Sequence, residues 1–195
     1  MKNKWLFYVT GFFSGLSVMA IELGASRLMA PYFSSSQMVW TIIIGTIMIA
    51  MALGNVIGGR MADKHKNPDR LFVWLFAAAT WTMLIPLVGK FIIAGVALVL
   101  ALFVTSNYLV TAAFVSCILV LVFPLLVLGM VTPNLVKFAV GSLEQNGRTT
   151  GIIEACNTVG SIIGTFLPTF VTIRFVGTSA TFVIFAGILY AVCLI

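Results

Sequence analysis

One carboxylate, Glu22, lies inside the first long apolar segment of the chain. A carboxylate in a membrane-spanning helix costs roughly 2.5 kcal/mol or more, so it needs a partner or a water-filled cavity. Helical spacing puts it on one face with four small or apolar residues, Gly11, Gly15, Val18 and Ser26. Arg27 lies about 140° away around the helix, so it does not share this face. We expect Glu22 either to pair with a neighbouring helix or to bind a cation or proton in a cavity.

A second polar set recurs every three or four residues in a later segment and therefore shares one helix face: Glu154, Thr158, Ser161, Thr165, Thr169 and Thr172, with Asn157 beside it. A polar face of this length in lipid typically lines a bundle interior or a water-filled cavity. Hydroxyl groups can bond to the backbone carbonyls of their own helix, so they do not by themselves indicate a cavity. The prediction of a cavity therefore rests on Glu154 and Asn157. Glu154 lies near the helix end and could instead pair with a loop. The predicted substrate or proton cavity comprises Glu22, Arg27, Asn157, Thr158, Ser161 and Thr165.

The elements that hold these residues are predicted to be membrane-spanning helices. Of 195 residues, 61% are apolar and 8% are charged, and the mean hydropathy is +1.16. A soluble domain is nearer 25% charged. A spanning helix needs about 20 apolar residues, which leaves room for roughly six or seven. The chain has no glycine-rich nucleotide loop, no nucleophile–base pair and no metal-ligand set, so we expect no enzymatic activity, metal or cofactor in it.

We expect an all-α integral membrane protein with a single transmembrane domain, residues 1–195, and six helices. Their predicted ranges are 5–29, 38–61, 71–89, 108–140, 151–173 and 176–195. Pro124 and Pro133 interrupt the fourth helix, and Pro168 lies within the fifth. Residues 90–106 have an apolar core of only 15 residues. That length is short for a span and is more typical of a re-entrant or interfacial segment.

The distribution of basic residues predicts the orientation. The chain has 11 Lys and Arg, 5 Asp and Glu and a net charge of +6. Six spans with an inner N-terminus place eight basic residues inside and three outside, which are Arg27, Lys90 and Arg174; a seventh span over 90–106 would give seven and four. We therefore expect a multi-pass protein of the cell (inner or cytoplasmic) membrane, in contact with the lipid bilayer, with both termini cytoplasmic. We expect these basic residues to set the orientation in the membrane and not to bind nucleic acid.

An internal repeat is visible in two seven-residue segments. Residues 53–59 (LGNVIGG) resemble residues 159–165 (VGSIIGT) at an offset of 106 residues. Three helices per repeat would give the two halves opposite orientations, as in many secondary transporters. The same residues form pairs spaced four apart that suit close helix packing, Gly54 with Gly58 and Gly160 with Gly164. Small-residue packing alone would also explain the match.

Several motifs resemble known membrane proteins. Residues 59–64 (GRMADK) resemble the loop 2–3 signature of the major facilitator superfamily, although Lys66 stands in the region of its second glycine. Further segments are similar to the membrane part of the fused major facilitator/spermidine synthase family: 20–23 (AIEL), 26–28 (SRL), 30–33 (APYF), 39–40 (VW), 52–54 (ALG), 123–124 (FP), 131–133 (VTP) and 157–160 (NTVG). Ser34 replaces a usual glycine, Glu154 replaces a usual aromatic residue, and the synthase half is absent.

The resemblance implies half of a major-facilitator-type fold with an inverted 3+3 repeat, and a connection to polyamines. Two functions follow. One is a homodimeric half-size transporter for a small, polyamine-like cation, or a proton-coupled one. The other is a membrane anchor or regulatory subunit for a separately encoded, spermidine synthase-like aminopropyltransferase.

The resemblance also implies a dimer contact made by the loop 2–3 motif, whose residues are Gly59, Arg60, Asp63 and Lys64. Asp63 would accept hydrogen bonds from the first backbone N–H groups of the partner's fifth helix, near Gly151. Arg60 would pair with Glu154 of the partner subunit. The alternative is that Asp63 and Arg60 pair within one chain.

Overall fold

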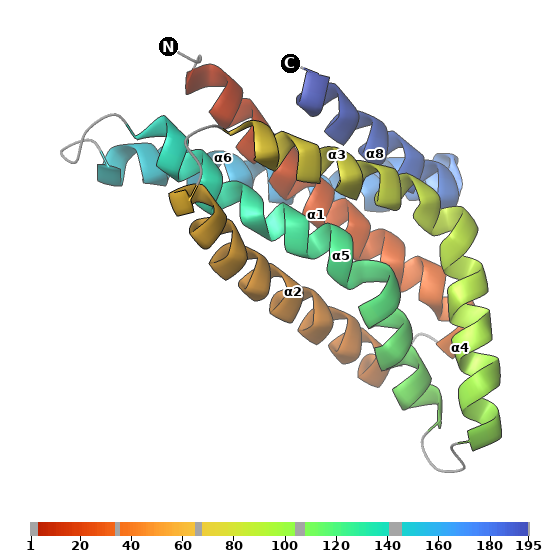
Figure 1. The fold of residues 1–195 in the computed structure, drawn as a ribbon. Helices are drawn as coiled ribbons and strands as arrows, with labels where there is room; N and C mark the ends of the chain where they lie inside the picture. The colour runs from red at the N-terminus through yellow and green to blue at the C-terminus, as the bar shows by residue number, and fades with distance from the viewer. Residues whose placement is uncertain (1–3, 34–35, 65–67, 104–107, 141–145, 195) are drawn as a thin grey trace.

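The computed structural model describes residues 4–33, 36–64, 68–103, 108–140 and 146–194, and within these residues it is helical and has no strand (Figure 1). Six stretches are long and apolar enough to cross a membrane, which confirms the predicted class and number of spans. The helices are α1 (Lys4–Phe33), α2 (Gln37–Lys64), α3 (Asp69–Leu84), α4 (Lys90–Phe103), α5 (Tyr108–Ala139), α6 (Asn146–Leu167), α7 (Ile173–Phe175) and α8 (Gly177–Leu194), with π-helical turns η1 (Ile85–Gly89) and η3 (Pro168–Thr172).

The third span is longer than the sequence predicts. Asp69–Phe103 forms one apolar helical stretch of 35 residues, in which η1 joins α3 to α4. The predicted helix ends at residue 89, whereas the structure continues it through residue 103; residues 104–106 of the predicted separate segment lie outside the described residues. Pro86 lies in η1. A wider π turn accommodates the missing N–H and the bulk of the proline ring, so the helix bends here without ending (Figure 1).

The length of α5 gives α4 a surface to pack on. α5 has 32 residues, which is about 48 Å at 1.5 Å per residue and exceeds a hydrocarbon core of about 30 Å. α4 packs against α5 and buries Ile93 fully. The apolar residues of α4 are thus accounted for by an extension of the third span, without a crossing of their own.

Helix α5 is not interrupted at Pro124 or Pro133, where the sequence suggests breaks. Pro124 has no N–H to donate to the carbonyl of Val120, four residues earlier. The indole Nε1 of Trp81, on α3, donates to that oxygen at 2.9 Å. The proline therefore frees an acceptor that ties α3 to α5, as expected where backbone groups must be satisfied inside protein.

Helix α1 lies along α6, and the two backbones approach closely at glycines. A Cβ atom added at Gly160 would overlap the backbone of Phe12, and one added at Gly164 would overlap the backbone of Leu16. Lipid tails are as apolar as leucine, so helix association in a membrane depends on such close contact. The small-residue pattern predicted on this helix is therefore an interface.

Helix α2 lies along α5 in a similar way. A Cβ atom at Gly54 would overlap the carbonyl of Leu126, and one at Gly58 would overlap Met130. α3 packs against α8, and α1 and α5 also contact each other. Among the described residues, the largest fully buried side chains include Ile21, Met29, Leu121, Leu125, Leu128 and Phe182.

The fifth span, Asn146–Phe175, passes Pro168 through the second π turn, η3, and continues into α7. Gly177 then adopts a φ of +84°, a left-handed conformation that glycine accepts without steric cost. The chain reverses here into α8, so that α1 begins and α8 ends at the same end of the bundle (Figure 1).

Replacing Gly160 with alanine should destabilise the fold by about 1–3 kcal/mol, because its Cβ would overlap the Phe12 backbone and force α1 and α6 apart. The matched control is Gly147→Ala on the same helix, where a Cβ meets no atom within 4 Å. It should change stability by less than about 1 kcal/mol. Reversible unfolding in mixed micelles measures both. Equal effects of the two changes would contradict the assigned contact.

Candidate functional site

The amide of Asn157 lies where α1, α5 and α6 meet. Its Nδ2 donates to the hydroxyl of Thr132 at 3.1 Å, and its Oδ1 accepts a long 3.5 Å bond from Ser161. Gly15 makes room for both, since a Cβ there would come within 2.8 Å of the Ser161 hydroxyl oxygen. Asn157 and Ser161 are half-buried. In the structure these two side chains therefore help to hold α1, α5 and α6 together.

The threonine hydroxyls of the polar face form hydrogen bonds within their own helix. The hydroxyls of Thr158, Thr165 and Thr169 each donate at 2.9 Å to the backbone carbonyl four residues earlier. Such bonds let a hydroxyl lie in an apolar segment without an outside partner. Each hydroxyl oxygen can still accept a hydrogen bond, but its proton is already donated to the backbone.

Part of the polar face is exposed on the single chain. Glu154, Thr158 and Thr169 are exposed, while Ser161 and Thr165 are half-buried. Glu154 makes no ion pair within the part of the chain that the structure describes. A carboxylate on the outside of an apolar helix bundle is costly in contact with hydrocarbon, so Glu154 favours a polar or protein neighbour.

Glu22 and Arg27 lie in different surroundings on α1. Glu22 is half-buried and has no hydrogen-bond or ion-pair partner within the described residues. Arg27 is exposed and lines a pocket of about 370 Å³. We call it the Arg27 pocket; its lining residues are Leu23, Ser26, Arg27 and Ala30 of α1, Trp40 of α2, Thr169 of η3 and Ile173 of α7.

The structure thus distributes the predicted cavity residues over three places. Arg27 lines the pocket, Asn157 and Ser161 lie at the helix crossing with Thr165 one turn further, and Thr158 lies on the exposed face. Glu22 is one helical turn from Ser26 and does not line the pocket. Of the six residues, only Arg27 lines the pocket that the described residues form.

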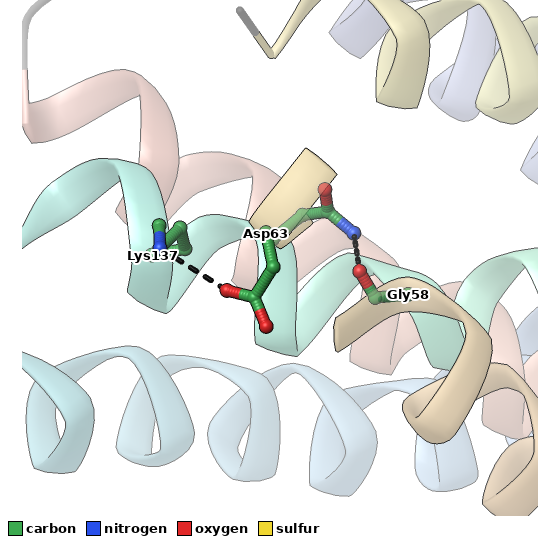
Figure 2. Close-up of polar contacts among 4 residues, drawn as sticks. Gly58, Asp63 and Lys137 are labelled. Atoms are coloured by element: carbon green, nitrogen blue, oxygen red, sulfur yellow. Dashed lines mark hydrogen bonds and ion pairs between the residues drawn. The ribbon is translucent and has the colours of Figure 1, made fainter. Parts of the chain in front are cut away.

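The loop 2–3 motif lies at the end of α2. Nζ of Lys137, on α5, pairs with Oδ1 of Asp63 at 3.1 Å within the same chain (Figure 2). In the within-chain alternative Asp63 was to pair with Arg60, whereas the structure pairs it with Lys137. Both side chains are largely exposed, 53% for Lys137 and 75% for Asp63, so the pair contributes little to stability. The predicted contact of Asp63, Arg60 and Glu154 with a second copy stays a prediction.

Sequence reasoning missed Asn134, which is buried on α5. Its Nδ2 donates to the carbonyl oxygen of Gly58 at 3.0 Å (Figure 2). It also donates to the carbonyl oxygen of Met130 at 2.8 Å. An amide among apolar residues beside Pro133 was the available signal. Asn134 and Lys137 together attach the last turns of α2 to α5.

Comparison of the chain with protein-family models, with curated proteins and with solved structures finds no match. The described residues also contain no group of three or more His, Cys, Asp or Glu side chains that could hold a metal ion. Function is therefore inferred from helix packing, from the placement of the polar side chains and from the motif resemblance.

Asn134→Ala should lower the free energy of unfolding by about 2–3 kcal/mol, because it removes two buried hydrogen bonds and leaves a small void. Lys137→Ala is the matched change at the same helix junction and should cost at most about 0.5 kcal/mol, since its ion pair is exposed. Unfolding in micelles compares the two. A larger loss from Lys137→Ala would reverse the assigned roles.

Proposed function

We propose that the chain is half of a facilitator-type transporter, that two copies form the working unit, and that it moves a small polyamine-like cation or couples transport to protons. The observation that carries this proposal is a set of helix contacts that occurs twice, with constant sequence offsets. Such duplication is the signature of carriers built from two inverted three-helix repeats.

The first duplicated contact joins Gly54 of α2 to Leu126 of α5, and Gly160 of α6 to Phe12 of α1. Gly54 and Gly160 are 106 residues apart, which is the offset of the LGNVIGG and VGSIIGT segments. Phe12 and Leu126 are 114 residues apart. In both contacts a Cβ on the glycine would overlap the carbonyl oxygen of the facing residue.

The same two offsets relate the contacts one helical turn further along. Gly58 faces Met130, and Gly164 faces Leu16. The glycines are again 106 residues apart and their partners 114. Small-residue packing alone does not require the facing residues to keep a constant separation, so the agreement supports a true repeat.

A third pair of contacts reverses the roles of the helices. A Cβ at Gly15 of α1 would overlap Asn157 of α6, and a Cβ at Gly129 of α5 would approach Met51 of α2. The two glycines are 114 residues apart, and Met51 and Asn157 are 106 residues apart. These contacts relate α1 to α5 and α2 to α6, which supports a repeat in which the first three spans correspond to the last three. An odd number of spans per repeat gives the repeats opposite orientations in the membrane.

The exposed polar face of α6 supports a dimer. The exposed carboxylate of Glu154 would contact lipid if the six helices worked alone, at a cost that spanning helices avoid. A second copy would cover this face and, with the first, make the twelve helices of a complete carrier. Glu22 and Glu154 from two copies would supply four carboxylates. That charge suits a cationic substrate or a proton, in keeping with the polyamine connection that the motif resemblance implies.

Purified protein in liposomes should take up radiolabelled spermidine, and Glu22→Gln should lower the initial rate at least about tenfold, because a charge-assisted hydrogen bond contributes 1.5–3 kcal/mol. Asp69→Asn, which removes a carboxylate at the start of α3, is the control and should transport normally. Uptake should also change with pH if Glu22 carries a proton.

If the Glu22→Gln protein is fully active, Glu22 has a role in helix packing and none in transport. The wild-type protein could instead show no uptake and bind a separately encoded aminopropyltransferase. That result would favour the anchoring function over transport.

Cysteines placed at Asp63 and Gly151 should crosslink between chains in membranes and give a dimer band, because the proposed contact sets the end of α2 against the start of the partner's α6. Cysteines at Asp63 and Lys137 are the control and should crosslink within one chain, since these side chains pair there. An exclusively intramolecular crosslink for Asp63 with Gly151, or full transport by a monomer, would refute the dimer.

A further inference from the structure

We propose that the Arg27 pocket binds an anionic group, a phosphate, through the guanidinium of Arg27. The pocket lies on a single chain, at the end of the bundle where α1 ends and α2 begins. The proposal goes beyond cation transport, and all seven lining residues belong to the described part of the chain.

Three hydrogen-bond donors line the pocket without a partner. Among the described residues, the guanidinium of Arg27, the hydroxyl of Ser26 and the indole Nε1 of Trp40 take part in no side-chain hydrogen bond. The planar guanidinium presents paired N–H groups that match two oxygens of a phosphate. A volume of about 370 Å³ is ample for such a group.

No carboxylate competes for Arg27 inside the pocket. Its lining residues include no Asp or Glu, and the Thr169 hydroxyl donates to the Thr165 carbonyl. Glu22 lies deeper on α1 and outside the lining, while Arg174, next to the lining residue Ile173, adds a second positive charge at this end. The local charge therefore favours an anion.

The internal repeat shows how this end of the bundle differs from the other. The offsets of 114 and 106 residues relate Leu23 to Lys137 and Thr169 to Asp63. At the other end of the bundle, Lys137 and Asp63 close the junction with an ion pair. At this end the corresponding leucine and threonine form no ion pair and border the pocket instead. The side chains of the pocket therefore leave the charge of Arg27 available to a ligand.

The lining also limits the chemistry of that ligand. The lining also has apolar groups beside these donors, which are Leu23, Ala30, Ile173 and the ring of Trp40. Tryptophan and arginine near a helix end are placed at the depth of lipid headgroups. A phospholipid headgroup and a free phosphate share the chemistry that Arg27 recognises, and an experiment with two arms separates them.

In the first arm, delipidated full-length protein in mild detergent is titrated with phosphatidylglycerol and bound lipid is counted by native mass spectrometry. Arg27→Gln should weaken binding at least about tenfold, because it removes a charge-assisted bond of 1.5–3 kcal/mol. Arg148→Gln, which removes an exposed cation from the first turn of α6, is the matched control and should bind as wild type. Arg27→Lys, which keeps the charge but loses the planar fork, should bind with intermediate affinity.

In the second arm, the midpoint of thermal unfolding is measured in sodium phosphate and in sodium chloride at equal ionic strength. Arg27-dependent lipid binding without a phosphate effect identifies a headgroup site. A phosphate-dependent rise that is lost in Arg27→Gln identifies a free-anion site. If neither ligand depends on Arg27, the proposal falls, and Arg27 serves only to reach the membrane surface.

A second variant covers the case in which Arg27→Gln does not fold. Trp40→Phe removes the indole donor but keeps an aromatic ring, and it should weaken the same binding. Trp5→Phe, at the opposite end of α1, is its control and should have no effect. Equal binding by Trp40→Phe and Trp5→Phe, with Arg27→Lys unchanged, would also overturn the proposal.

Discussion

The close backbone contact at two glycine-lined helix crossings holds this structure together. Within a membrane, burying apolar side chains between helices gives little advantage over leaving them in lipid, so association depends on short-range packing. The glycines of α6 bring its backbone against α1, and those of α2 bring its backbone against α5. The remaining helices are attached to these two pairs, as Trp81 of α3 shows by donating to a carbonyl that Pro124 frees on α5.

The glycine contacts also place the polar groups. Gly15 leaves space for Asn157 and Ser161, which would otherwise collide with α1. At the equivalent α2–α5 crossing, Gly58 brings its carbonyl within reach of Asn134. The two crossings correspond in backbone geometry but differ in chemistry. One end of the bundle is closed by an ion pair between Asp63 and Lys137, and the other has a pocket lined by Arg27.

The sequence predicted the features that depend on composition and spacing. Hydropathy and length identified six spans, and glycines four residues apart identified the helix faces that pack. It did not predict how Pro86 is accommodated, because a π turn in place of a helix end depends on α4 finding a surface on α5. The spacing of the polar face on α6 was right, but which hydroxyls bond to their own backbone depends on side-chain rotamers. Lys137 was missed as the partner of Asp63 because the two are 74 residues apart.

The opposite orientation of the two halves is tested most directly by the sidedness of α2 and α6. Single cysteines would replace Gln37 and Asn146, the first residues of these helices, in a protein whose native cysteines are changed to alanine. A membrane-impermeant maleimide should label the two positions from opposite sides of sealed vesicles. Labelling of both from the same side would contradict the inverted repeat, and with it the account of how these six helices are related.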